Sequence, residues 1–528
     1  MKRKIHFLSI LLFSLYSNIG FAQITFQEKI VGTSSAEECN SVQLTSNGGY
    51  IFVGMTRSYG AGDNDIYLVK INSNGDTAWT RTIGGIGEED GYSVQQTSDS
   101  GFIVSGTTNS FGAGSNDVFI VKVDTNANVL WTKTIGGTNY DFCNSIQQTI
   151  DGGYIATGGT SSFGAGGKDV YFIKMDSNGD TVWTKTYGGI NDDWGNVVQQ
   201  TRDSGFIIVG TFGSDGFSIG DIYLIKTNKY GDTTWTKSFG GAGYNLGSSV
   251  QQTTDNGYII VGYAGSFGVG SGDIYLIKTD SFGNLLWSKT IGEANYTNNG
   301  SCVFQTNNSG YIFLSNQTLN IIGAQIDVSL IKVDSVGDIL WKKTFGGSDS
   351  EHGNSFQQTN DGGYIIAATT SDFGTSYDDF YLIKTDSSGN SGCNEINATT
   401  ITTIPPTQVA SPLIIISSGG ITTTPTPLVG SGGIITLLCS NVGINEIASD
   451  ISFYIFPNPS VNNFTVSFER MIMKGNIEIL TALGESVFKE IILNEMSKEI
   501  SLKDISGGVY CVKVCDGEKY YTKKLIIQ

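Results

Sequence analysis

The chain has little charge, and positive charge is the scarcer kind. Charged residues make up 15% of the 528 positions, below the roughly 25% of an average soluble protein. Lysine and arginine number 31 against 49 aspartates and glutamates, which leaves a net charge of -18. A surface that binds a nucleic-acid duplex needs clustered Lys and Arg to neutralise phosphates. Nucleic acid is therefore not an expected partner.

Cysteines are few, and their positions do not suggest disulfides. There are 7 of them, an odd number, and Cys39, Cys143 and Cys302 stand singly. Cys511 and Cys515 lie four residues apart in an expected strand, which separates them by about 13 Å, too far for a bridge. No disulfide framework is expected.

The apolar run at the N-terminus is too short to remain in a membrane. Three positive residues precede an apolar stretch (7–15), and Gly20 and Ala22 follow at the two positions that a signal peptidase reads. About 20 apolar residues would be needed to span a bilayer. We expect residues 1–22 to be a Sec signal peptide cleaved after Ala22, and no transmembrane segment.

The sequence is rich in glycine, with 70 residues, and it repeats internally. One unit reads "NSIQQT", "IDGG", "YIATGGT", "SSFGAGGK", "DVYFIKMD", "SNGD" and "TVWTKTYGG". Four short runs of β-forming residues separated by Gly, Asn and Asp turns predict a four-stranded antiparallel meander. Tryptophans mark the repeat at intervals of 52, 52, 52, 52 and 54 residues: Trp79, Trp131, Trp183, Trp235, Trp287 and Trp341.

These repeats predict an all-β fold with a seven-bladed β-propeller over residues 23–388. A unit of about 50 residues cannot bury both faces of its sheet alone, so neighbours must pack on it, and radial packing gives a propeller. The innermost strands begin at residues 40, 92, 144, 196, 248, 301 and 354.

The two ends of the repeat array are expected to close the ring. The seventh unit lacks a tryptophan strand, whereas the N-terminal "ITFQEKIVG" resembles one, with Phe26 in the tryptophan position. We expect residues 24–31 to pair into the last blade, which leaves no open sheet edge between the ends. The protein is expected to be a monomer.

Each third strand begins with aspartate and has lysine five residues later. A catalytic residue is needed once, whereas these residues recur in every unit, so we interpret them and the tryptophans as packing and hydrogen-bonding elements. The pairs are Asp65 and Lys70, Asp117 and Lys122, Asp169 and Lys174, Asp221 and Lys226, Asp273 and Lys278, Asp327 and Lys332, and Asp379 and Lys384.

The repeat pattern "DVYFIKMDSNGDTVWTKTYGG... DGGY" resembles the secreted bacterial β-propeller repeats of the SBBP and delta-60 type, over residues 24–388. More distantly, the spacing of Asp176, Gly179 and Trp183 is similar to the docking motif of quinoprotein propellers, with a turn one residue shorter. The quinone cofactor is not implied, because those enzymes use two adjacent cysteines and no cysteines are adjacent here.

Residues 389–448 are rich in Thr, Ile, Ser, Pro and Gly, and we interpret them as a linker. Their isoleucine clusters are unusual for a spacer, and a small β element is the alternative. Residues 449–528 show alternating strands, enough for a small β-sandwich.

The last segment resembles the type A C-terminal sorting domain of type IX secretion cargo from Bacteroidetes. The resemblance implies that the type IX secretion machinery is a partner and that the protein passes through the periplasm to the outer-membrane surface or the medium. The matching positions are Pro457, Asn458 and Pro459; Leu483, Gly484 and Glu485; Gly508, Val509 and Tyr510; and Lys523 and Lys524.

One position varies from blade to blade where the chain enters each innermost strand, and such positions are expected to surround the mouth of the central channel. It holds Glu38, Asp90, Phe142, Trp194, Leu246, Asn299 and His352. Loops on a rigid scaffold commonly carry binding sites. One interpretation is neutral drift; the other is a shallow site in which Phe142 and Trp194 stack on a sugar or peptide and the acids hydrogen-bond it.

No catalytic residue can be assigned. His352 is the one histidine after residue 22, and nothing in the sequence places a nucleophile beside it. Glycoside hydrolysis needs two carboxylates at a set separation, and the many loop acids neither locate nor exclude such a pair.

No cofactor or metal is expected, although calcium stays open because "GAGDND" (60–65) and "GGIGEED" (84–90) resemble calcium turns. Calcium-roll turns recur every nine residues, whereas this repeat is about 52 residues long. Three functions remain: a surface binding or adhesion module for a glycan or protein, which we favour; a polysaccharide-degrading enzyme; and a structural surface component.

Overall fold

The computed structural model describes residues 28–32, 35–214, 219–319, 325–373, 377–397, short segments between 401 and 437, and 453–527 with short gaps. The expected signal peptide, residues 1–22, lies outside these residues. The chain divides into two compact units, residues 1–439 and 440–528. Every regular element described is a strand, so no helix in this part of the chain could cross a membrane.

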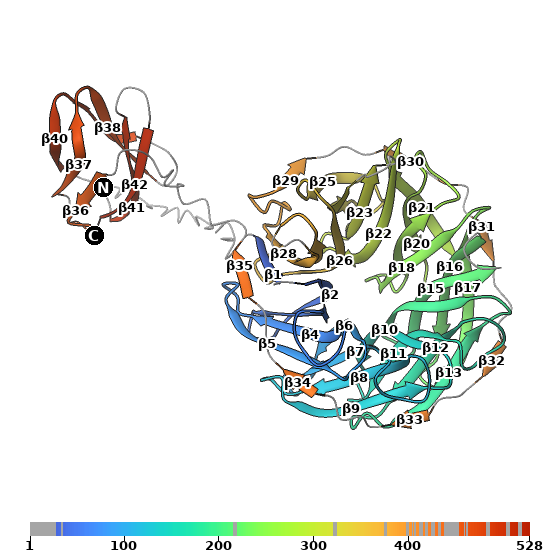
Figure 1. Cartoon of the computed structure of the whole chain (residues 1–528). Helices are drawn as coiled ribbons and strands as arrows, with labels where there is room; N and C mark the ends of the chain where they lie inside the picture. Colours follow the sequence, from blue (N-terminus) through green and yellow to red (C-terminus); the bar gives the residue numbers. More distant parts are fainter. Residues whose placement is uncertain are drawn as a thin grey trace, which may run out of the picture. The chain divides into compact units, whose positions relative to one another are not determined.

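The described part of the first unit contains seven five-stranded antiparallel sheets arranged around a common centre, as in a β-propeller (Figure 1). The innermost strands are β2 (Glu37–Leu44), β6 (Glu89–Gln96), β10 (Asp141–Gln148), β14 (Asp193–Gln200), β18 (Asn245–Gln252), β22 (Tyr296–Gln305) and β26 (Glu351–Gln358). The second strands are β3 (Tyr50–Thr56), β7 (Phe102–Thr108), β11 (Tyr154–Thr160), β15 (Phe206–Ser214), β19 (Tyr258–Ala264), β23 (Tyr311–Leu319) and β27 (Tyr364–Thr370).

The outer half of each sheet contains three more strands. The third strands are β4 (Asp65–Ile71), β8 (Asp117–Val123), β12 (Asp169–Met175), β16 (Ile219–Thr227), β20 (Asp273–Thr279), β24 (Ile326–Val333) and β28 (Asp379–Thr385). The fourth are β5 (Thr77–Gly84), β9 (Val129–Gly136), β13 (Thr181–Gly188), β17 (Thr233–Gly240), β21 (Leu285–Gly292), β25 (Ile339–Phe345) and β1 (Glu28–Gly32). The fifth are β34 (Leu428–Gly430), β33 (Ile421–Thr423), β32 (Ile415–Ser417), β31 (Gln408–Ala410), β30 (Ile401–Thr403), β29 (Glu395–Asn397) and β35 (Ile434–Leu437).

The second and third strands are covered on both faces by neighbouring sheets. Every residue of β3 and β4 is buried, whereas residues of β2 alternate between buried and more open positions. Leu68 on β4 belongs to the same apolar core as Val104 and Phe119 of the next sheet. Each sheet therefore needs its neighbours to bury its apolar faces.

The N-terminal strand β1 pairs with β28 of the last repeat, in a register one residue away from the predicted one. Val31 stands opposite Phe380 as Tyr187 stands opposite Val170, so Gly32 takes the place of Gly188. Phe26, predicted in the tryptophan position, lies outside the described residues.

Glu28 anchors β1 through its buried carboxylate. It accepts hydrogen bonds from the Tyr381 hydroxyl (2.6 Å), the Ser391 hydroxyl (2.8 Å) and the Asn394 amide (2.9 Å). Burial raises the pKa of this carboxyl, and the three hydrogen bonds oppose that rise.

Paired glutamines connect each innermost strand to the next one. The side-chain oxygen of Gln147 accepts the Gln200 N–H at 2.6 Å, and in return the Gln200 side-chain oxygen accepts the Ile150 N–H at 2.9 Å. The Gln357 side chain accepts the Leu44 N–H at 2.7 Å, so this contact also connects the last innermost strand to the first. At the sixth sheet Phe304 replaces the glutamine and packs edge-on against Phe356, with ring centroids 5.0 Å apart.

The repeated tryptophans pack against the following sheet, as the sequence predicts. A side chain at Gly231, in the turn of the next sheet, would collide with the Trp183 ring, and Gly231 has a φ of 77° that favours glycine. Trp235 likewise meets Tyr258 of the next sheet edge-on, with ring centroids 5.9 Å apart.

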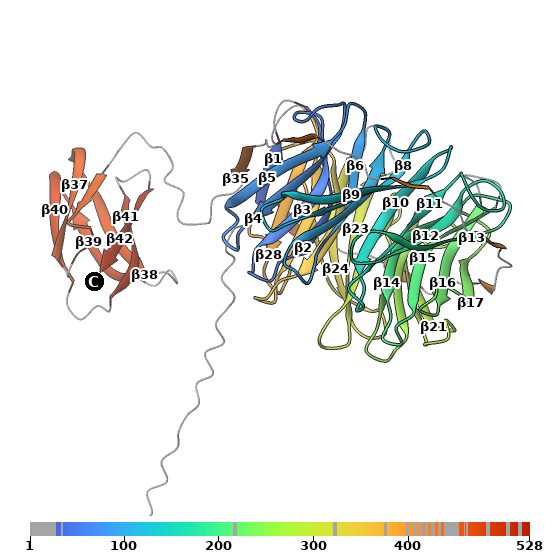
Figure 2. The same cartoon turned by 90° about the horizontal axis from the view of Figure 1, so that it is seen from below.

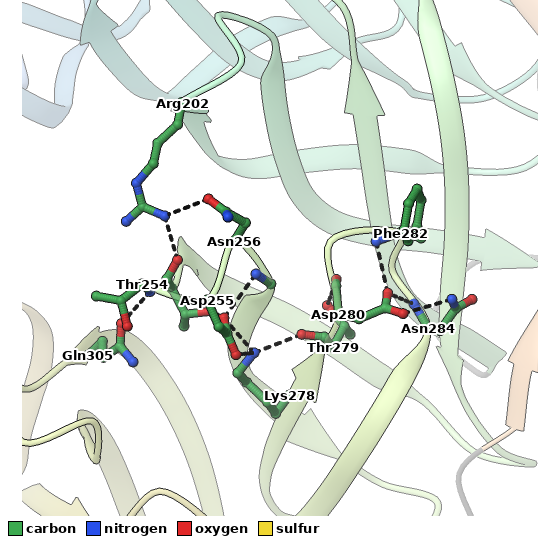
Figure 3. A network of polar contacts seen from close by, with 12 residues as sticks. Arg202, Thr254, Asp255, Asn256, Lys278, Thr279, Asp280, Phe282, Asn284 and Gln305 are labelled. Carbon is green, nitrogen blue, oxygen red and sulfur yellow. Dashed lines mark hydrogen bonds and ion pairs between the residues drawn. The ribbon is translucent and has the colours of Figure 1, made fainter.

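The repeated lysines pair with hairpin-turn aspartates rather than with the aspartate that begins their own strand. Figure 3 shows Lys278 beside Asp255, with 2.9 Å between the charged atoms, near the Thr254 N–H that donates to Gln305 at 2.7 Å. Arg202 of the preceding sheet donates to the Thr253 carbonyl oxygen at 2.7 Å. Equivalent ion pairs are Lys122–Asp99, Lys174–Asp151, Lys226–Asp203 and Lys384–Asp361.

Residues 389–448, predicted to be a linker, contain the seven fifth strands β29–β35, which we call the belt. The linker prediction is therefore wrong for these strands. Belt strands pair with fourth strands in reverse order, from β29 on β25 to β34 on β5 and β35 on β1, and they lie at the outer edge of the sheets in Figure 1. The open edge of each fourth strand offers unpaired backbone groups. The isoleucine and threonine clusters supply short β segments that recur every six or seven residues.

Cys393, just before the belt, is disulfide-bonded, which corrects the expectation of no disulfides. Cys39, Cys143, Cys302, Cys511 and Cys515 are not disulfide-bonded.

The second unit has two antiparallel sheets that share one apolar core (Figure 2). One sheet has the order β36-β37-β40 and the other β39-β38-β41-β42. Phe464 and Val466 of the first pack in the same core as Ile477 and Val512 of the second. The strands are β36 (Phe453–Phe456), β37 (Asn463–Ile472), β38 (Gly475–Thr481), β39 (Ser486–Ile492), β40 (Glu495–Ser501), β41 (Gly508–Cys515) and β42 (Tyr520–Ile527).

Lys70 in the first sheet lacks the aspartate partner, which gives a test of the lysine pairs. Its ammonium donates to Thr45 Oγ1 at 3.1 Å, and the turn holds Asn47 where other sheets hold aspartate. Burial lowers the pKa of Lys70 to about 8. The folded state therefore binds fewer protons than the unfolded state between pH 8 and the ordinary lysine pKa of about 10.4. Charging this lysine costs stability at neutral pH.

We expect Asn47→Asp to increase the free energy of unfolding at pH 7, because the new carboxylate can pair with the Lys70 ammonium. The increase should be only about 0.5–1 kcal/mol, because the aspartate is solvent-exposed. The gain should shrink as the pH rises above 8 and Lys70 loses its proton. Denaturant unfolding at pH 7 and pH 10 measures it. Asp255→Asn, the reverse change in the fifth sheet, is the control and should lower stability at pH 7; an unchanged Asn47→Asp curve would contradict the role assigned to the pair.

Candidate functional site

The glycine loop of a sheet meets the loop that leads into the next sheet. Isolated bridges join Asn64 to Glu88 and Asn116 to Tyr140, one residue from each loop. Both sets of loops therefore lie at the same end of the sheets, as the sequence predicts.

The seven variable residues share one register at that end, and we call them the rim. Each stands at the start of an innermost strand, opposite an equivalent residue of the second strand. The pairs are Glu38 with Met55, Asp90 with Thr107, Phe142 with Gly159, Trp194 with Thr211, Leu246 with Tyr263, Asn299 with Asn316, and His352 with Thr369.

Phe142 and Trp194 come together at Gly159. A side chain at Gly159 would collide with the Phe142 ring and would lie 3.3 Å from Trp194 Cβ, so the absence of one there lets both residues approach. The Tyr140 ring joins them, with its centroid 5.5 Å from that of Phe142. We call Tyr140, Phe142 and Trp194 the aromatic corner.

A cavity of about 530 Å³ opens beside Tyr140. Its lining includes Asn139, Lys168 and Asp192, and the Asp192 carboxylate accepts the Lys168 N–H at 2.8 Å. The Lys168 ammonium lies 3.8 Å from the same carboxylate. An aromatic surface beside charged and amide groups can stack on an apolar face of a ligand and hydrogen-bond its polar edge.

Glu38, Asp90 and His352 form an acidic part of the rim. Asp90 accepts hydrogen bonds from the Asn64 amide at 3.0 Å and the Tyr92 hydroxyl at 3.4 Å. Loss of water among the loops raises the pKa of Glu38, and the Asp378 and Asp90 carboxylates raise it further. His352 is exposed, yet the loops around it withdraw enough water to lower its pKa, against the attraction of Asp378.

Leu246 and Asn299 are not part of either group. Leu246 stands opposite Tyr263, whose ring lies 6.3 Å from that of Tyr244. The buried side-chain oxygen of Asn299 has no hydrogen-bond partner among the described residues.

Tyr140, Lys168 and Asp192 were not predicted from the sequence. Tyr140 and Asp192 occupy the position two residues before the rim, which holds Glu88, Tyr244 and Ser350 in other repeats. Because a tyrosine occurs there twice, that position alone does not distinguish Tyr140.

A second cavity, of about 580 Å³, was also missed and lies between the third and fourth sheets. Ile150, Val182 and Tyr230 line it beside Trp183, and all three expose more than half of their side-chain surface. Ser98 and Asn178 occupy the places of Ile150 and Tyr230 in neighbouring repeats. In the fifth sheet Phe282 occupies the place of Tyr230, so an exposed aromatic residue recurs at that position.

The acids of the two proposed calcium turns bind backbone groups. Asp65 accepts the Ala61 N–H at 2.9 Å, and the Glu89 carboxylate accepts the Gly85 N–H at 2.5 Å. In the part of the chain that the structure describes, no three His, Cys, Asp or Glu side chains come together as a metal site.

The sorting-motif residues lie mainly along β36, β41 and β42. The Asn458 side chain accepts the Ile526 N–H at 2.8 Å, and the Lys523 ammonium lies 5.1 Å from the Tyr454 ring centroid. Tyr510 is buried, Pro457 is exposed, and Lys524 pairs with Cys511. Gly508 and Val509 begin β41. Pro459 and the motif residues at 483, 484 and 485 lie outside the described residues.

Comparison with known proteins gives two family matches. Residues 454–528 match the secretion system C-terminal sorting domain, and residues 144–373 match the family of outer membrane protein assembly factor BamB. No curated protein matches the chain. Among solved structures, MPT-4, a mannose phosphorylase from Leishmania mexicana in complex with phosphate, is similar with 10% identity and a TM-score of 0.28, covering 44% of this chain and 79% of that one.

The sorting domain and the repeat match agree with the resemblances seen in the sequence, and the sorting domain implies a Bacteroidetes source. The chain is a β-propeller protein with a C-terminal sorting domain, exported through the type IX secretion system to the cell surface or the extracellular space.

Proposed function

We propose that residues 23–388 form a seven-bladed propeller, closed by the N-terminal strand, that binds an extracellular glycan or protein at the rim. The observation that carries the binding proposal is the aromatic corner beside the cavity at Tyr140. Three aromatic residues lie there, at positions that hold non-aromatic residues in several other repeats. Repeated positions build the sheets, so a cluster at varying positions is where a ligand would be recognised.

The chemistry of this corner suits a sugar or a peptide with a planar or apolar face. Phe142 and Trp194 place aromatic side chains beside Gly159, and Lys168, Asp192 and Asn139 offer charged and amide groups at the cavity that Tyr140 also lines. Because exported proteins work outside the cell, a glycan or protein of the surroundings is the ligand class within reach.

An enzyme that cleaves polysaccharides is the second candidate, since Glu38 and Asp90 stand on neighbouring innermost strands with Asp378 close to Glu38. Against it, the Thr369 hydroxyl opposite His352 accepts the Cys39 N–H at 3.0 Å, and the aromatic corner is centred on the third and fourth sheets. A purely structural surface component is the third candidate.

Closure predicts that deleting residues 23–32, with the signal peptide joined to residue 33, lowers the melting temperature by about 5 °C or more. The reason is that β28 would lose the strand between it and β35, and Tyr381 would lose its hydrogen bond to Glu28. Thermal unfolding and light scattering measure stability and aggregation. An unchanged melting curve without aggregation for this deletion would contradict closure.

The rim site predicts that Trp194→Ala weakens binding to a glycan or peptide array about tenfold or more, the loss expected for an aromatic contact at the centre of a site. Leu246→Ala, at the same register in the fifth sheet, is the matched control and should bind as the unaltered protein does. Equal binding by both variants would move the site away from the aromatic corner. Measurable cleavage of an array glycan would favour the enzyme.

Two export steps are proposed: a Sec signal at residues 1–22 and a sorting domain at residues 449–528. Removing residues 453–528 should leave a folded propeller in the periplasm of the native host, because the unit read by the type IX machinery would be gone. Cell fractionation and surface protease treatment measure this. Fusing residues 449–528 to a periplasmic reporter should send the reporter outside; truncated protein at the surface in normal amounts would contradict the assignment.

A further inference from the structure

Two carboxyl groups meet at five of the sheet junctions. One comes from the first buried aspartate of a third strand, and the other from the innermost strand of the following sheet. We call them acid pairs: Asp65 with Glu89, Asp117 with Asp141, Asp169 with Asp193, Asp327 with Glu351, and Asp379 with Glu37. In each pair, one oxygen of each of the two side chains lies beside the same glycine. For Asp169 and Asp193 this glycine is Gly188, and a Cβ added there would collide with Asp169.

The hydrogen bonds of the third pair leave one oxygen without a donor. Asp193 accepts the Gly189 N–H at 2.7 Å and the Gly213 N–H at 2.9 Å, one on each oxygen. Asp169 accepts the Ala165 N–H at 2.9 Å on Oδ2, while its buried Oδ1 has no hydrogen-bond partner. Both residues have 0% of their surface exposed. A buried anionic oxygen without a donor costs free energy unless a proton neutralises it.

The second pair has the same pattern. Asp141 Oδ2 accepts the Gly137 N–H at 2.7 Å, while Asp117 Oδ1 is buried without a partner and lies against Gly136 with the Asp141 carboxylate. The unpartnered atom is again the third-strand oxygen that faces the other acid.

At the junction after the fourth sheet, an asparagine takes the place of the second acid. Its third-strand residue is Asp221, and the facing position holds Asn245 instead of an acid. The Asn245 side-chain nitrogen lies 3.3 Å from Asp221 Oδ1, and it lies 2.8 Å from both the Gly243 carbonyl oxygen and Ser266 Oγ. The amide nitrogen lies against Gly240 where Asp193 Oδ2 lies against Gly188. An asparagine at this position has N–H groups to direct at its neighbours, whereas an acid in its place can supply a hydrogen only in the protonated form.

We propose that each acid pair is a proton-binding site, in which the third-strand aspartate carries a proton on its inner oxygen and donates it to the facing carboxylate. The propeller would therefore bind up to five protons at its sheet junctions, none of them at the ligand-binding rim. The inference does not depend on the proposed binding function.

A proton fits this position better than a metal ion. The two oxygens lie close to where a Cβ of the glycine would be, and calcium would need six to eight oxygen ligands. The described residues around the pairs contain no group of three His, Cys, Asp or Glu side chains.

The charges around the third pair do not replace the proton. Asp192 and Asp169 repel the Asp193 charge, and Tyr223 lies near both members of the pair. Lys168, which directly precedes Asp169, is ion-paired with Asp192. Burial is the main cause that raises the pKa of Asp193 to about 7, and burial also raises that of Asp169. Because the two groups interact, the proton belongs to the pair.

The fourth acid pair has a different surrounding but the same tendency. The pKa of Glu351 is raised to about 7, mainly by burial and also by the charges of Asp327 and Asp372. Lys342 faces Asp327 and opposes the rise there. Tyr381 is also close to Glu351.

The sign of the pH effect follows from these raised pKa values. The folded protein holds the proton up to about pH 7, whereas an unfolded aspartate releases it near pH 3.9. The contribution to stability is complete below the unfolded pKa and is lost as the pH rises toward 7. One proton changes the unfolding constant by up to about tenfold per pH unit in that window.

Two opposite substitutions test the proposal in the secreted full chain. Asp193→Asn copies the natural Asn245 junction and should reduce the change in the unfolding constant between pH 5 and pH 8 by about tenfold or more. Asn245→Asp adds a sixth acid pair and should increase that change by a similar factor, with little effect at pH 5. Denaturant unfolding at pH 5, 6, 7 and 8 measures both. If Asn245→Asp leaves the pH dependence unchanged, the proposal is wrong.

Infrared spectroscopy supplies a test that does not need a folded variant. At pH 6 the unaltered protein should show the carbonyl stretch of protonated carboxylic acids, which an ionised carboxylate lacks, and the band should fade as the pH rises to 8. Absence of the band at pH 6 would overturn the proposal.

Discussion

The repeat depends on one hydrogen bond, from the backbone N–H of an innermost strand to the side-chain oxygen of a glutamine in the preceding sheet. The Gln147 side chain accepts the Gln200 N–H at 2.6 Å, and other innermost strands repeat the contact. A glutamine reaches its neighbour only when the two strands keep one register, so the contact constrains the offset of successive sheets. Where Phe304 replaces the glutamine, an edge-on contact with Phe356 holds the neighbouring strands instead.

Residues that build the sheets and residues that could serve a ligand are separated by this geometry. Tryptophans and acid pairs connect one sheet to the next, hairpin-turn ion pairs stabilise a single sheet, and all of them recur from repeat to repeat. The rim stands at the end of the same strands but takes no part in those connections, so its side chains can differ. Phe142 can lie over Gly159 because the facing position in that sheet has no side chain. Variation at the rim therefore leaves these repeated contacts unchanged, and Asp90 adds one of its own by accepting a hydrogen bond from Asn64 of the preceding sheet.

Much of the architecture could be predicted from the sequence because turns, β-branched runs and tryptophans recur at a fixed spacing. The four strands of a unit, the packing role of Trp183 and the strand pairing of β1 were all expected, although Val31 lies one residue from its predicted register. The belt was not predicted, since strands of three or four residues have no periodicity of their own and form only on an existing sheet edge. The meeting of Tyr140 with Phe142 depends on loop geometry that the sequence does not specify.

Amide hydrogen exchange of the innermost strands tests most directly whether the glutamine contacts run around the whole array. The Leu44 N–H donates to Gln357 across the ends of the array, and the Gln200 N–H donates to Gln147 within it. If the array is a ring, both amides should exchange slowly and at similar rates, because opening either requires the sheets to separate. An open array would leave the Leu44 amide exchanging orders of magnitude faster than that of Gln200, and this result would contradict the account.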